Sequence, residues 1–162
     1  RMVTQKDFPG WGHMLNSGAT TLWETWKYSD NVYSHNHPMF GSVGEWLYQS
    51  LGGIQATAPG FKEFRVKPFF VKNLQWMNCR YQSVYGEIRS EWKMDNGCYI
   101  LQVMVPVNTQ AKVYLPAQAE QITEGNISLR EVKNIRVVEE KSNSTCVEVP
   151  SGVYSFKIPI YN

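Results

Sequence analysis

The sequence has few cysteines and almost no net charge. Its 162 residues include only three cysteines, Cys79, Cys98 and Cys146, so any disulfide scheme leaves one thiol unpaired, and their spacing is not that of a zinc site. We therefore expect structural thiols. The 16 Lys and Arg residues against 14 Asp and Glu residues give a formal charge of +2, which argues against nucleic acid or a membrane surface as a partner.

The sequence also lacks a membrane-spanning run, an internal repeat and a targeting segment. No stretch of about 18 apolar residues occurs, so we expect no membrane span. With 43% hydrophobic and 19% charged residues, the composition is that of a globular protein. Because the chain begins with Arg1 and not with methionine, we expect it to be a piece of a longer polypeptide. The start of the chain carries no signal for a compartment. We favour a periplasmic or extracellular location over a cytoplasmic one.

Two parts of the chain differ in composition. All three histidines and four of the six tryptophans precede residue 60. The segment 57–60, Thr-Ala-Pro-Gly, is typical of a turn or linker. We therefore predict a first domain over residues 1–58 and a second over residues 59–162.

The second part has the pattern of a β-sandwich, in which short β-branched and aromatic runs are separated by Gly, Pro, Asn and Asp. Asn96-Gly97 predicts a tight hairpin, because these residues adopt the positive φ angles that such a turn needs. The run 98–105 is apolar on both faces, which indicates a central strand. The predicted strands are Phe61–Val66, Leu74–Val84, Gly86–Met94, Cys98–Val105, Ala111–Leu115, Ile135–Lys141, Thr145–Val149 and Val153–Ile158. We expect a mainly β fold, an antiparallel sandwich of about eight strands.

One or two α-helices are expected before the sandwich. Apolar residues at spacings of three and four predict a helix with one buried stripe, starting at Pro38 and ending at the glycines 52–53. A shorter helix is predicted around Trp11–Leu15. The residues of the stripe are Phe40, Val43, Leu47, Leu51 and Ile54.

Glu24 is the candidate for proton transfer. If residues 20–26 are extended, its side chain shares a face with Leu22 and Trp26, while Trp23 points away. Partial desolvation against aromatic rings would raise the pKa of this carboxyl group toward the range of a general base. Trp23 and Trp26 are candidate sugar contacts, because an indole packs well against the C–H face of a sugar. The alternative is a surface glutamate between two core tryptophans.

The segment His35-Asn36-His37 is a second candidate site. At a helix N-cap, His37 would be neutral, because the positive end of the helix dipole disfavours an imidazolium, and it could hydrogen-bond a hydroxyl. Simple capping is the alternative. A His-x-His pair is a weak metal motif, but no suitable third ligand is near, so we expect no metal and no cofactor. Asp30 could supply a second carboxylate, although its surroundings indicate an exposed turn, and no residue stands out as a general acid.

Four segments resemble the end of the catalytic barrel of bacterial α-L-rhamnosidases. They are Phe-Pro-Gly-Trp-Gly at 8–12, Gly-Ala-Thr-Thr-Leu-Trp-Glu-Thr-Trp at 18–26, Ser-His-Asn-His at 34–37, and Phe-Gly-Ser-Val-Gly-Glu-Trp-Leu-Tyr at 40–48. The chain from Gly53 onward resembles the C-terminal β-sandwich of the same enzymes. The resemblance implies one or two helices left from an (α/α)6 barrel, then the sandwich, and hydrolysis of terminal α-L-rhamnosides with inversion and without a metal.

The resemblance also implies roles for particular residues. Glu24, in the Thr-Thr-x-Trp-Glu motif, would be the general base, and His37 would contact the sugar, with Asn36 beside it as a further candidate. The general acid would lie upstream of this chain, so we expect the chain alone to be inactive. Its expected partners are that upstream barrel and a rhamnose-containing glycoside or polysaccharide.

Two other functions stay open at this point. A sandwich with clustered tryptophans would suit a carbohydrate-binding or purely structural module, and a helical barrel with a sandwich can serve another sugar. For residues 60–162 we expect a scaffold, because the strands show no row of exposed aromatic residues.

Overall fold

The computed structural model describes residues 2–29 and 33–160 and divides into two units, Arg1–Trp46 and Leu47–Asn162. The turn at residues 57–60, where the sequence suggests a boundary, lies inside the second unit. It connects strand β1 (Ile54–Ala56) to strand β2 (Glu63–Val66), and these two strands pair with each other. Each unit is described by itself below.

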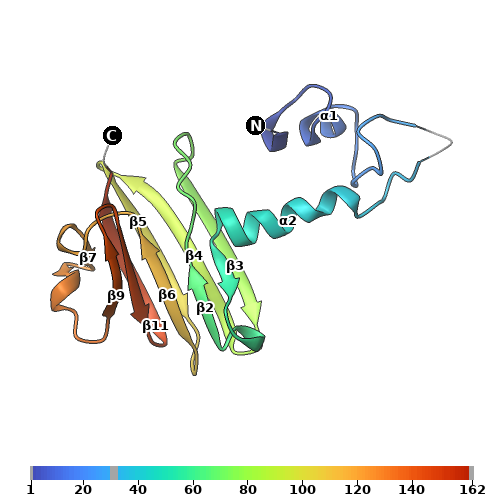
Figure 1. The fold of residues 1–162 in the computed structure, drawn as a ribbon. Helices are drawn as coiled ribbons and strands as arrows, with labels where there is room; N and C mark the ends of the chain where they lie inside the picture. The colour runs from blue at the N-terminus through green and yellow to red at the C-terminus, as the bar shows by residue number, and fades with distance from the viewer. Residues whose placement is uncertain (1, 30–32, 161–162) are drawn as a thin grey trace. The chain divides into compact units, whose positions relative to one another are not determined.

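The second unit consists of two β-sheets (Figure 1), with strand orders β1-β2-β6-β10-β9 and β3-β4-β5-β11-β7-β8. The parallel pairing of β2 with β6 departs from the antiparallel pattern of the other pairs. The remaining strands are β3 (Trp76–Ser83), β4 (Gly86–Asp95), β5 (Cys98–Val105), β6 (Gln110–Leu115), β7 (Thr123–Glu124), β8 (Ile127–Ser128), β9 (Arg136–Lys141), β10 (Ser144–Val149) and β11 (Gly152–Pro159). Within the described residues, the mainly β fold and all eight predicted strands are confirmed, and the short strands β1, β7 and β8 add to them.

The hairpin between β4 and β5 forms where the sequence predicts it. Asn96 and Gly97 connect the strands and have φ angles of 47° and 75°, the positive values that a tight turn requires. Strand β5 pairs with β4 on one side and with β11 on the other. Its central position in the sheet is therefore confirmed; Leu101 and Val103 point into the core, whereas Gln102 on the outer face is exposed.

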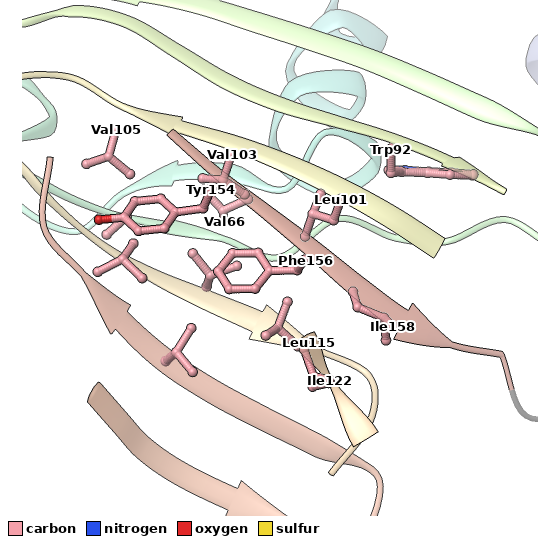
Figure 2. Packing of buried hydrophobic residues seen from close by; sticks show 14 of the residues in the cluster. Val66, Trp92, Leu101, Val103, Val105, Leu115, Ile122, Tyr154, Phe156 and Ile158 are labelled. Atoms are coloured by element: carbon pink, nitrogen blue, oxygen red, sulfur yellow. The ribbon is translucent and has the colours of Figure 1, made fainter. Parts of the chain in front are cut away.

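The core lies between the two sheets. Alternate residues of each strand point inward, so Leu101 and Phe156 of one sheet pack toward Val66 and Leu115 of the other (Figure 2), and none of the four is exposed to solvent. Trp92 is 2% exposed and packs against the rings of Phe70 and Tyr99. Burial of these side chains is the main stabilising contribution of the sandwich.

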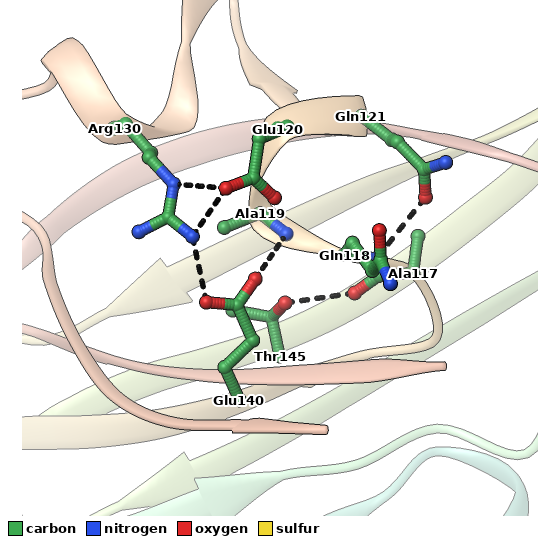
Figure 3. Close-up of polar contacts among 8 residues, drawn as sticks. All are labelled: Ala117, Gln118, Ala119, Glu120, Gln121, Arg130, Glu140 and Thr145. Carbon is green, nitrogen blue, oxygen red and sulfur yellow. Dashed lines mark hydrogen bonds and ion pairs between the residues drawn. The ribbon is translucent and has the colours of Figure 1, made fainter. Parts of the chain in front are cut away.

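A polar network holds one end of the sandwich together. A short 3-10 helix, Ala119–Gln121, presents the N–H of Ala119 to a carboxylate oxygen of Glu140 at 3.0 Å (Figure 3). Arg130 bonds both Glu140, at 2.7 Å, and Glu120, at 2.6 Å. The buried Thr145 donates its hydroxyl to the carbonyl of Ala117 at 2.8 Å. These contacts fasten the loops around β7 and β8 to strands β9 and β10.

The predicted helix before the sandwich is present, beginning one residue after Pro38 and ending directly before the glycines 52–53. Helical turns run from Met39 to Leu51, as η2 (Met39–Ser42), α2 (Val43–Trp46) and the π-helical η3 (Leu47–Leu51). Ile54 lies in β1, so its assignment to the helix is wrong. Gly53 follows the helical turns with a φ of 73°, and a β-carbon at this position would collide with the backbone of Lys67 and Pro68, so only glycine fits.

The apolar stripe of this helix is not fully buried in this chain: Phe40, Val43 and Leu51 are partly buried, and Leu47 is exposed. Burial of this stripe against helices of a longer polypeptide stays a prediction. The shorter helix is confirmed as α1 (Trp11–Asn16). The short helical turns elsewhere are η1 (Met2–Thr4), η4 (Pro59–Phe61) and η6 (Leu129–Glu131). Among the described residues, no helix is long and apolar enough to cross a membrane.

The packing of Phe156 leads to a test of the core. Phe156→Ala should lower the free energy of unfolding by about 3–5 kcal/mol, because it removes a fully buried ring and leaves a cavity. The control is Val153→Ala on the same strand, where the side chain is 72% exposed and a change within about 0.5 kcal/mol is expected. Urea unfolding followed by far-UV circular dichroism measures both, and equal effects would contradict this description of the core.

The cysteines allow a second test. Burial raises the pKa of the Cys79 thiol to about 11, so at about pH 8 it is almost entirely protonated and a poor nucleophile. Iodoacetamide should modify the partly exposed Cys98 first, and modification of Cys79 should accelerate as the pH rises toward that pKa. Peptide mass spectrometry over time measures both sites. Modification of Cys79 as fast as that of Cys98 at about pH 8 would be the contrary result.

Candidate functional site

The segment around Glu24 is held by backbone hydrogen bonds to the segment before the helix. The N–H of Glu24 donates to the carbonyl of Ser34 at 2.9 Å, and the N–H of His37 donates to the carbonyl of Leu22 at 2.8 Å. Thr21 adds a hydroxyl bond to the carbonyl of His35. Residues 20–27 are bent and form no strand, so the extended conformation considered above is not adopted. The pairing nevertheless brings the two predicted site segments together.

The Glu24 carboxylate is oriented by the same pairing. Its Oε2 accepts the N–H of Ser34 at 2.8 Å, and the side chain is partly buried. A backbone donor restricts the rotation of a carboxylate group. Such a carboxylate can accept a proton from a water molecule on its free side.

The two tryptophans beside Glu24 belong to different aromatic clusters. Trp26 is partly buried, stacks on Phe40 with ring centroids 3.9 Å apart, and meets Trp11 edge-on at 5.0 Å. Trp23 is only 4% exposed and packs against Tyr28 and His35. Trp23 therefore acts here as a core residue. The sugar-contacting roles suggested for both rings stay predictions.

His37 accepts a hydrogen bond at the start of the helix. Its Nδ1 takes the N–H of Met39 at 3.1 Å, so this nitrogen carries no proton and the ring can present Nε2–H as a donor. Asn36 is exposed, and its N–H donates to the Ser34 hydroxyl at 3.1 Å. The His35 ring has a different partner, since its Nε2 lies within hydrogen-bond distance, 2.6 Å, of the carbonyl oxygen of Ser29. The roles of Asn36 and His37 in sugar binding stay predictions.

Ser34 is the residue of this site that sequence reasoning missed. It holds Glu24 through a backbone N–H, a group that every residue except proline carries, so no side-chain pattern signals it. Asp30, the candidate second carboxylate, lies outside the described residues. No group of three or more His, Cys, Asp or Glu side chains suited to a metal occurs in residues 2–29 and 33–160.

Two family models match the chain. Residues 1–51 match the six-hairpin glycosidase domain of bacterial α-L-rhamnosidases, and residues 53–130 match the C-terminal domain of the same enzymes. The junction between the two matches falls at Gly52, where the helical turns end and the first strand of the sandwich follows.

Individual relatives agree with these matches. An α-L-rhamnosidase of Formosa agariphila is 28% identical over 97% of this chain, and one of Streptomyces avermitilis is 31% identical over 72% of it. The chain spans 18% and 12% of the lengths of these two relatives.

Solved structures give the same result. The α-L-rhamnosidase of Dictyoglumus thermophilum matches 98% of this chain with a TM-score of 0.84 and 33% identity, and the chain covers 18% of it. The α-L-rhamnosidase of Streptomyces avermitilis, solved in complex with L-rhamnose, matches 97% of the chain with a TM-score of 0.83 and 26% identity, and the chain covers 15% of it. The chain belongs to the bacterial α-L-rhamnosidase family and corresponds to the C-terminal region of these enzymes.

Proposed function

We propose that this chain supplies the general base for the hydrolysis of terminal α-L-rhamnosides with inversion, and that Glu24 is this base. The observation that carries the proposal is the hydrogen bond from the Ser34 N–H to Glu24 Oε2 at 2.8 Å. That bond leaves the second oxygen to act on a water molecule. Membership of the rhamnosidase family supports the choice of sugar.

In the proposed reaction, Glu24 removes a proton from a water molecule while the water oxygen attacks the anomeric carbon. The bond from the anomeric carbon to the leaving oxygen breaks, and a general acid on the opposite face donates a proton to that oxygen. Attack from the face opposite the leaving group inverts the configuration. We assign the acid to the upstream barrel, so the chain alone carries only half of the catalytic pair and is inactive.

His37 and Asn36 would position the sugar. With Nδ1 occupied by the Met39 N–H, the His37 ring is oriented and its Nε2–H can donate to a sugar hydroxyl. The exposed Asn36 amide both donates and accepts. Because the pairing of residues 22–24 with 34–37 joins both residues to Glu24, substrate binding and proton removal would share one rigid element.

The base assignment is tested in the longer rhamnosidase that contains this chain. Glu24→Gln should reduce kcat on an aryl α-L-rhamnoside by about 10² or more, because an amide cannot accept the proton from water but can still accept the Ser34 N–H. Glu45→Gln, at an exposed glutamate of α2, is the matched control and should retain near-normal turnover.

Two outcomes would count against this proposal. Near-normal kcat in Glu24→Gln would remove Glu24 as the base. Turnover of the same substrate by the 162-residue chain alone would show that the acid lies within it.

The Ser34 contact gives a separate prediction that needs no activity. Glu24→Ala should speed amide hydrogen exchange at Ser34 by about tenfold or more, because the acceptor is lost, whereas Glu24→Gln should preserve protection through its side-chain oxygen. Residue-resolved NMR exchange measures both variants, with the His37 amide, bonded to Leu22, as internal reference. Equal protection of Ser34 in both variants would show that Glu24 does not hold this amide.

A further inference from the structure

The outer face of strands β3, β4 and β5 carries a groove of about 370 Å³. Met77, Trp92 and Leu101 of these strands point into the core and are at most 7% exposed. Residues that alternate with them point to the opposite face, and this volume is within the range of small-molecule sites, about 300–1,000 Å³. The outward residues that line the groove are Trp76, Asn78, Glu91, Lys93, Ile100 and Gln102.

The strand register arranges these side chains in two adjacent rows. Trp76 lies opposite Lys93, which lies opposite Ile100, and Asn78 lies opposite Glu91, which lies opposite Gln102. One row therefore holds an indole, the charged side chain of Lys93 and an aliphatic side chain, and the next row is entirely polar. Neighbouring side chains on adjacent strands are within contact range, so one ligand could touch both rows.

Trp76 is 62% exposed, a large apolar area to leave in water. An exposed indole is a natural platform for a ligand that has both apolar and polar edges. A pyranose ring is such a ligand, because its C–H groups form an apolar face and its hydroxyls project from the rim. The amides of Asn78 and Gln102 can donate to and accept from those hydroxyls.

Two charged side chains line the groove, Glu91 and Lys93. Arg80 reaches across from β3 and bonds Glu91 at 2.7 Å, so this carboxylate is already neutralised by an internal partner. The pair keeps Glu91 in place and leaves it able to accept from a hydroxyl. All the lining residues lie on hydrogen-bonded strands, so little ordering is required when a ligand binds.

We propose that this groove is a non-catalytic binding site for an oligosaccharide, with one sugar ring stacked on Trp76 and its hydroxyls bonded by Asn78 and Gln102. The site goes beyond the proposed catalytic role and does not need Glu24. The sequence predicts only a scaffold for residues 60–162, because its strands show no row of exposed aromatic residues. The proposed site needs no such row, since it combines one exposed tryptophan with a row of polar side chains. Only the choice of a rhamnose-containing probe rests on the proposed function.

The test follows the indole N–H signal of Trp76 by NMR. This signal is identified as the one that disappears in the Trp76→Phe variant. The probes are L-rhamnose up to about 50 mM and a neutral rhamnose-containing disaccharide, rutinose, up to about 10 mM, concentrations at which weak millimolar binding is detectable. The Trp76 signal should shift saturably with rutinose. Asn78→Ala should weaken rutinose binding by about fivefold or more. Trp76→Ala should weaken it by about tenfold or more; because this variant has no Trp76 signal, its binding is measured by calorimetry.

Phe69→Ala is the matched control, because Phe69 is 63% exposed in the same unit but does not line the groove. It should bind like the unmodified chain. No shift of Trp76 with either probe would overturn the proposal, and so would binding that Trp76→Ala leaves unchanged. In the longer enzyme, Trp76→Ala should leave kcat/KM on an aryl α-L-rhamnoside unchanged. If the Glu24 assignment is wrong, the kcat of Glu24→Gln will show it, and sugar binding at Trp76 will be unaffected.

Discussion

The backbone pairing of residues 22–24 with residues 34–37 is the constraint on which the site depends. Two hydrogen bonds, from Glu24 to Ser34 and from His37 to Leu22, join segments that no regular sheet or helix connects. The same pairing lets the Ser34 N–H reach the Glu24 carboxylate. Without it, Glu24, the proposed base, and His37, the proposed sugar contact, would lie on independent loops, and each would have to be ordered when substrate binds.

The aromatic clusters give this pairing its support. Trp23 packs beneath it against Tyr28 and His35, and Trp26 packs against Trp11 and Phe40. The two indoles thus belong to two aromatic clusters of one unit. In the other unit, regular strands present side chains on both faces of a rigid sheet, and the outer face of that sheet carries the groove at Trp76.

The regular parts of the fold could be predicted from the sequence, because their signals are local. Asn96-Gly97 specifies a hairpin by backbone preference, and alternating apolar residues specify strands. The end of the helix could be predicted from the glycines 52–53 but not from apolar spacing, because Ile54 continues the helical period while Gly53 turns the chain against Lys67. Glu24 and His37 were accessible as candidates through their motifs. Ser34 was not, because it acts through its backbone, and the exposure of Trp76 depends on which sheet face the core occupies.

The central claim is that Glu24 faces the reacting carbon of a bound rhamnoside. The most direct measurement is a crystal structure of the longer enzyme with L-rhamnose bound. The account predicts that the Glu24 carboxylate lies within one water molecule of the anomeric carbon and that His37 contacts a sugar hydroxyl. A sugar bound with Glu24 turned away from the anomeric carbon, and with another carboxylate in its place, would contradict it.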